Sequence, residues 1–177
     1  MATASQSAPA GPTGRGWGIC VGAVAGLVWL YFALKFDHAP DWALIAVYAM
    51  SASLLLAGIM RIRSDRKSGL PQSSATRFAF LIVVAIEVVA IVAAVNLLPR
   101  WHLQQYMLAA VAIIVGLHYI PLATIFRTRI YYPISLMMVA ATVAAAALLE
   151  GTQQMICIGY SMGATFFLSA LIRAALR

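Results

Sequence analysis

Six long apolar stretches occupy most of the 177-residue chain and limit what it can fold into. A helix that crosses a membrane needs about 20 mostly apolar residues, whereas the strands of a membrane β-barrel are segments of about 10 residues that alternate in hydropathy. The stretches here are too long and too uniformly apolar for a barrel. The sequence therefore predicts an all-α, polytopic membrane protein, a six-transmembrane-helix bundle. The predicted spans are residues 17–34, 42–60, 77–98, 104–126, 130–149 and 153–172.

The spans leave no room for a separate soluble domain. Residues 1–16 are rich in Ala, Ser, Thr, Pro and Gly and are expected to form a disordered cytoplasmic tail. Residues 17–177 then form a single transmembrane domain. The longest predicted connection, residues 61–76, separates the first helix pair from the rest, and the other connections are short. Short connections favour antiparallel packing of consecutive helices.

The basic residues predict the orientation of the spans. With a cytoplasmic N-terminus, all of the 12 lysines and arginines except Lys35 and Arg100 fall on the cytoplasmic side. The positive-inside rule therefore predicts that both termini are cytoplasmic, as in a multi-pass protein of a bacterial inner membrane. The net charge of +7 is expected to set this orientation and to contact anionic membrane lipids rather than nucleic acid. Aromatic residues at the span ends fit an interfacial belt: Trp17, Trp42, Trp101, Tyr131 and Tyr132.

Glu87 is the only acidic residue inside a predicted span. An ionisable residue in hydrocarbon is costly and is by default a candidate functional site. At a rise of about 1.5 Å per residue, Glu87 lies about 15 Å from the cytoplasmic end of its span and His118 lies about 12 Å from the same end of the next span. The two residues should therefore share a depth on adjacent helices. They are either a proton-relay pair or hydrogen-bonded structural residues, and the sequence leaves both readings open.

Pro121 follows His118 closely in the fourth span. It leaves the carbonyl of Leu117 without its helical donor and favours a kink, so Pro121 is a candidate hinge. A kink beside His118 and Tyr119 could open a small polar cavity, or it could serve packing alone, with Tyr119 near the interface. Both interpretations remain open.

The segment Gly116-Leu117-His118-Tyr119-Ile120-Pro121 is followed by a short basic loop and a fifth span. It resembles an uncharacterised family of six-helix bacterial membrane proteins, which carry a Gly-x-His-aromatic-aliphatic-Pro segment in the fourth helix. The likeness extends loosely over residues 99–149. The resemblance implies a six-helix bundle in which His118 and Pro121 are motif positions, and it implies no activity, ligand or cofactor.

Glycines recur at intervals of four residues, which puts them on one face of a helix and lets another backbone approach closely. These candidate helix-packing residues are Gly18, Gly22 and Gly26 in the first span and Gly159 and Gly163 in the sixth. They could pack the first helix against the last or form a homodimer contact. An ion or ligand path along the groove is the alternative.

Hydroxyl residues in other spans share the depth of Glu87, and they could line a polar pocket or bond their own helix backbone. They are Ser51, Ser53, Thr142, Ser161 and Thr165. Ser161 joins Glu87, His118 and Tyr119 in the candidate proton or ligand site. Asn96 is nine residues beyond Glu87 and falls on the opposite face of the same helix, so it is excluded from this site.

No pattern in the sequence supports a catalytic or metal-binding site. Residues 159–163 match Gly-x-Ser-x-Gly by letter, but they lie inside an apolar span rather than on a strand-to-helix turn. Cys20 and Cys157 fall near opposite sides of the membrane, too far apart for a disulfide, and are expected to be free.

We therefore predict no enzyme, metal or cofactor. The expected function is a proton-linked transporter or permeation unit that uses Glu87 and His118; the alternative is a non-transporting interaction, lipid-associated or sensor protein.

Overall fold

The computed structural model describes residues 15–67, 74–126 and 128–175, which form helices and short connections without a strand. Six α-helices are long and apolar enough to cross a membrane, which confirms the predicted fold of a multi-pass membrane protein. They are α1 (Arg15–Phe36), α2 (Asp41–Lys67), α3 (Ser74–Arg100), α4 (Met107–Ile125), α5 (Tyr131–Leu148) and α6 (Gly151–Ala175). A 3₁₀ turn, Gln104–Tyr106, precedes α4.

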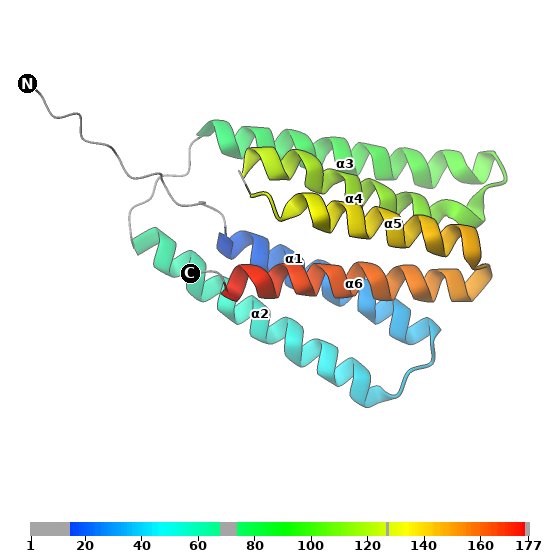
Figure 1. Cartoon of the computed structure of the whole chain (residues 1–177), viewed down its shortest axis with the longest axis horizontal. Helices are drawn as coiled ribbons and strands as arrows, with labels where there is room; N and C mark the ends of the chain where they lie inside the picture. Colours follow the sequence, from blue (N-terminus) through cyan, green and yellow to red (C-terminus); the bar gives the residue numbers. More distant parts are fainter. Residues whose placement is uncertain (1–14, 68–73, 127, 176–177) are drawn as a thin grey trace, which may run out of the picture.

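The helices divide into two groups (Figure 1). In one, α1 packs most extensively against α6 and also against α2. In the other, α4 lies between α3 and α5, and α5 joins the groups by packing on α6. Consecutive helices α2 and α3 lie at opposite edges. The first helix pair is set apart from α3–α5 but not from the rest of the bundle, because α6 packs on both α1 and α2.

The connection between α2 and α3 is shorter than the 16-residue loop expected at 61–76. Helix α2 continues through the basic segment to Lys67, and α3 begins at Ser74. Arginine and lysine have good helix propensity, and beyond the apolar span nothing opposes continuing the helix into water. Residues 68–73 lie outside the described residues. So does the expected tail, except Arg15 and Gly16, which begin α1.

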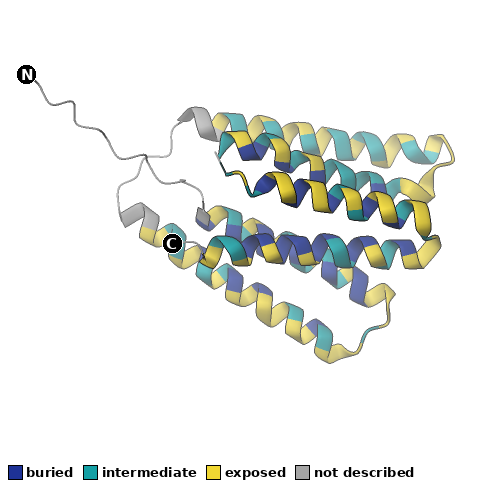
Figure 2. Ribbon diagram, viewed as in Figure 1, coloured by how far each residue is buried: buried dark blue, intermediate teal, exposed yellow. Residues whose placement is uncertain are grey.

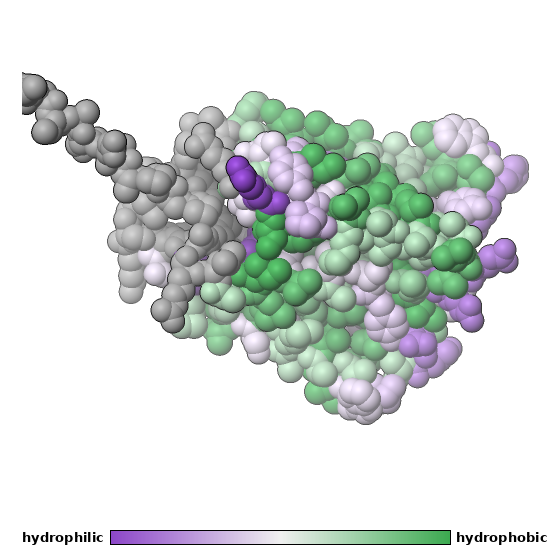
Figure 3. Space-filling model, viewed as in Figure 1, coloured by the Kyte–Doolittle hydropathy of each residue, from purple (hydrophilic) through white to green (hydrophobic). Residues whose placement is uncertain are grey.

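The first turn of α1 and the last turn of α6 lie at the same end of the molecule as the α4–α5 connection (Figure 1). The opposite end carries the α1–α2, α3–α4 and α5–α6 connections. Hydrophilic residues gather at that opposite end, and hydrophobic residues cover the middle of the face in view (Figure 3). This distribution is the one that a bilayer requires of a bundle that crosses it.

Small residues allow α1 and α6 to pack closely. A Cβ added at Gly22 would lie 3.1 Å from the carbonyl oxygen of Phe166, and one added at Gly159 would lie 3.2 Å from that of Trp29. Gly26 and Gly163 likewise face each other's helix, so four of the five candidate packing glycines line this interface. Buried residues follow α6 along its length, whereas α3 has none within its span (Figure 2).

Tyr131 departs from the expected aromatic belt. Trp17, Trp42, Trp101 and Tyr132 are exposed at helix ends, but Tyr131 is buried in the core. Both cysteines are free, and the Cys20 thiol lies against the carbonyl oxygen of Leu55 on α2.

Candidate intramembrane site at Glu87 and His118

Glu87 and His118 are in direct contact across the α3–α4 interface. Helix α3 carries Glu87 at its centre, and the short connection at residues 101–106 turns the chain back so that α4 brings His118 to the same depth. The imidazole Nδ1 meets the carboxylate Oε2. The side chains are 12% exposed for His118 and 17% exposed for Glu87, so the pair is partly buried between α3 and α4.

A carboxylate and an imidazole in contact can share one proton, and the pair as a whole can bind or release another. With the proton on the imidazole the contact is an ion pair, and with it on the carboxyl group the contact is a neutral hydrogen bond. Groups of this kind inside membrane bundles form proton relays. The arrangement therefore has the chemistry to exchange a proton within the membrane.

Tyr119 points away from Glu87 and into the centre of the bundle. Because neighbouring helical residues are rotated by about 100°, the step from His118 to Tyr119 turns the side chain from α3 toward α5 and α6. The Tyr119 ring meets the edges of Tyr131 and Phe166 at centroid distances of 5.4 and 5.9 Å. Its hydroxyl bonds to that of Ser169 and lies within electrostatic range of Arg173 and Glu87. Tyr119 thus connects the region of the Glu87–His118 pair with α6.

Arg173 is a partly buried residue whose inward contacts sequence reasoning missed. The positive-inside count places it by its position in the sequence only, and its guanidinium lies against Gly18 of α1 and Tyr131 of α5. The guanidinium lies 4.3 Å from the centroid of the Tyr131 ring. A Cβ added at Gly18 would lie 1.5 Å from its Nη1, so Gly18 makes room for Arg173 rather than for a helix backbone. Among the described residues, the buried Nε of Arg173 has no hydrogen-bond partner.

Replacing Arg173 with lysine is expected to lower the free energy of unfolding by about 1 kcal/mol, because an ammonium cannot stack its plane on Tyr131 as a guanidinium does. The measurement is reversible unfolding in mixed detergent micelles. A matched change, Arg129→Lys, alters an exposed residue of the α4–α5 connection and should leave stability unchanged. Equal losses in both variants would show that the stacking contributes nothing specific.

The other residues expected near Glu87 are not brought to it. Ser161 bonds the carbonyl of Ile158 on its own helix and lines a shallow depression with Asp37 and Tyr160. Ser53 and Thr165 also bond their own helices, at Ala49 and at Ser161.

Two further hydroxyls lie between helices. The Ser51 hydroxyl donates to the carbonyl of Ala23 on α1, 3.0 Å away. The Thr142 hydroxyl is buried and has no partner in the part of the chain that the structure describes. Asn96 bonds the carbonyl of Val92 on its own helix, away from the pair, as its position on the opposite face predicts.

Pro121 lies within α4, which continues as one helix to Ile125. The hydroxyl of Thr124 donates to the carbonyl of Pro121 over 2.8 Å. The proline therefore stands three residues beyond His118 in an unbroken helix.

No protein-family model, curated protein or solved structure matches this chain.

Proposed function

We propose that this protein is a proton-linked transporter or permeation unit for a small solute, in which Glu87 binds the proton and His118 is its partner. The direct contact of a carboxylate with an imidazole midway along two apolar helices is the observation that carries the proposal. A charge in such a position costs about 2.5–3.5 kcal/mol on insertion scales, and groups kept despite this cost commonly mark ion or proton paths.

Protonation can be coupled to movement because α3 lies at the edge of the bundle and packs mainly on α4. Adding a proton to the Glu87–His118 pair, or removing one, replaces an electrically neutral contact by one with net charge. The attraction between α3 and α4 then changes, and α3 has few other contacts that oppose its displacement. Pro121 is the candidate hinge that would let the end of α4 follow.

The test is solute-evoked proton movement in liposomes that contain the purified protein. Candidate solutes are added in turn, and an entrapped pH-sensitive dye reports proton uptake or release. The wild-type protein should give a signal with at least one solute, and Glu87→Gln should reduce it to that of empty liposomes, because glutamine keeps the shape but cannot bind the proton. Asn96→Ala on the same helix is the matched control and should keep the full signal. A solute-evoked signal that survives in Glu87→Gln would refute the proposal.

A second candidate is a non-transporting interaction, lipid-associated or sensor protein in which Glu87 and His118 only hold α3 on α4. One observation favours it: a shallow open depression in the described part of the molecule is lined by Asp37 and residues of α6, and Glu87 and His118 do not belong to its lining. This candidate requires Glu87→Gln, which can still hydrogen-bond to His118, to keep both folding and cellular function. The transporter requires that it stay folded and lose function.

We also propose that both termini face the cytoplasm of a bacterial cell and that the protein lies in its inner membrane, alone or as a homodimer. The distribution of lysine and arginine supports this orientation. The first turn of α1 and the last turn of α6 lie at the same end of the molecule, which is compatible with it.

A further inference from the structure

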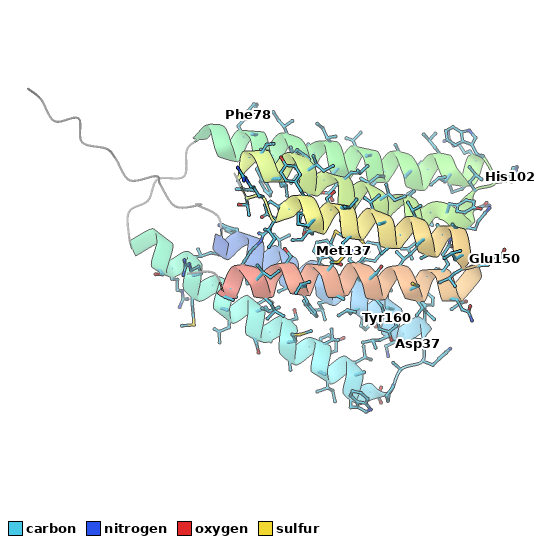
Figure 4. All side chains as sticks on the ribbon, in the orientation of Figure 1. Asp37, Phe78, His102, Met137, Glu150 and Tyr160 are labelled. Carbon is cyan, nitrogen blue, oxygen red and sulfur yellow. The ribbon has the colours of Figure 1, made fainter. Side chains whose placement is uncertain are left out.

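A shallow depression runs along α6 at the end of the molecule that carries the α1–α2 connection. Five of its lining residues are Gln153, Ile156, Cys157, Tyr160 and Ser161. Their spacing of three and four residues makes them one face of the helix. Asp37, which follows the last residue of α1, completes the lining, and it lies beside Tyr160 in Figure 4.

The depression carries a negative charge that nothing described neutralises. Asp37 is its one charged lining residue. The Tyr160 hydroxyl donates to Asp37 Oδ2 over 2.8 Å, and within the described ranges no cation forms an ion pair with this carboxylate. The ammonium of Lys35, two residues away in sequence, instead lies 6.0 Å from the centroid of the Tyr31 ring. The charge of the depression therefore complements a cation.

The shape and position of the depression favour a cation that carries an apolar chain. From Gln153 to Ser161 it extends about 12 Å along α6, at about 1.5 Å per residue. Asp37 lies beside Tyr160 toward the inner end of the depression and Gln153 lies at its outer end, while Ile156, Cys157 and the ring of Tyr160 make the lining largely apolar. The same face of α6 continues with Ala164 and Leu168, which are exposed, so the depression opens sideways, toward lipid.

We propose that this depression binds a membrane lipid with a primary ammonium head group. The ammonium donates to Asp37, the head group covers Cys157 with the Gln153 amide at its outer side, and the chain continues past Ser161 toward Ala164 and Leu168 and the middle of the bilayer. This site goes beyond the proton-linked function proposed for Glu87 and His118 and does not depend on it, since none of its residues belongs to that pair.

Cys157 provides a direct measurement because its exposed thiol lines the depression. The protein is placed in phosphatidylcholine nanodiscs that contain increasing amounts of phosphatidylethanolamine, whose head group is the unmethylated counterpart of choline. The rate of Cys157 alkylation by N-ethylmaleimide is followed by mass spectrometry of its peptide, with Cys20 as the internal reference. A lipid at about ten times its dissociation constant should slow the reaction about tenfold, because it leaves about one site in eleven free.

Variants separate this site from general effects of the lipid. Asp37→Asn removes the charge and should abolish the protection, whereas Asp41→Asn, at the exposed start of α2, should retain it. Glu87→Gln should also retain it, which distinguishes failure of this proposal from failure of the proton-linked function. Full protection in Asp37→Asn, no protection by phosphatidylethanolamine in the wild-type protein, or equal protection by free ethanolamine would each overturn the proposal.

Discussion

Replacing His118 with alanine is expected to lower the free energy of unfolding by about 3 kcal/mol, the cost of a carboxylate left alone in the apolar part of a membrane helix. Glu87 contacts His118 at the centre of α3, and 17% of its side chain is exposed, so water cannot fully replace the lost imidazole. A simple hydrogen bond between membrane helices would contribute only about 0.6–1.7 kcal/mol. The expected loss is larger because Glu87 must either stay charged without a partner or take up a proton. Reversible unfolding in mixed detergent micelles measures the difference.

The double variant Glu87→Leu/His118→Leu should recover most of that loss, because it leaves no polar group without a partner. Replacing a buried ion pair by apolar residues is often neutral or stabilising, whereas removing one partner is strongly destabilising. Asn96→Ala is the control on α3, since Asn96 is exposed and bonds only its own helix. A loss in the double variant that equals the sum of the losses in Glu87→Leu and His118→Leu would show that the two residues are not energetically coupled.

Replacing Gly163 with valine is expected to destabilise the protein by about 3 kcal/mol, the upper part of the usual range for overpacking a filled core. A Cβ at Gly163 would lie 2.4 Å from the Cγ of Leu30 and 3.1 Å from its backbone nitrogen. Leu30 cannot yield by a change of rotamer alone because its main chain is also in contact. The α1–α6 interface, which is the most extensive in the bundle, would have to separate.

Ala164→Val is the matched control for this variant. It adds similar bulk at the next position of α6, where the side chain is exposed, and should change stability by less than about 0.5 kcal/mol. The unfolding transitions of the two variants are compared under the same detergent conditions. A similar loss in both would mean that valine in α6, rather than close packing against Leu30, is the cause.

Hydropathy was sufficient to predict the six helices because the need to satisfy backbone hydrogen bonds in hydrocarbon applies to each span separately. It could not predict where helices end beyond the membrane. Helix α2 continues to Lys67 because charged residues are compatible with a helix in water. In water, the length of an apolar stretch does not indicate where a helix ends. Nor could it predict that α6 returns to pack beside α1. The glycine spacing offered this packing beside a homodimer contact, and the fit of the two helix surfaces decided for it.

The candidate site likewise has features that the sequence predicts and others that only the packing of the helices decides. The shared depth of Glu87 and His118 followed from helix rise alone, but their contact required the relative rotation of α3 and α4, which the sequence leaves open. Ser161 has the depth of Glu87, yet it lies on a face of α6 directed elsewhere. Charge counting assigns Arg173 to the cytoplasmic side and says nothing about the direction of its side chain. The room left by Gly18 and the ring of Tyr131 allow its guanidinium to turn inward.

The sequence by itself determined the membrane fold, the six spans and the depth of its one intramembrane acid, because these depend on length, hydropathy and rise per residue. Only the tertiary structure decided which faces meet: Glu87 with His118, Gly163 with Leu30, and Asp37 with Tyr160. Which side chains face each other depends on the rotation of each helix about its own axis and on the order in which the helices pack. Both are set by the sum of many small contacts between distant segments, and no local pattern records that sum.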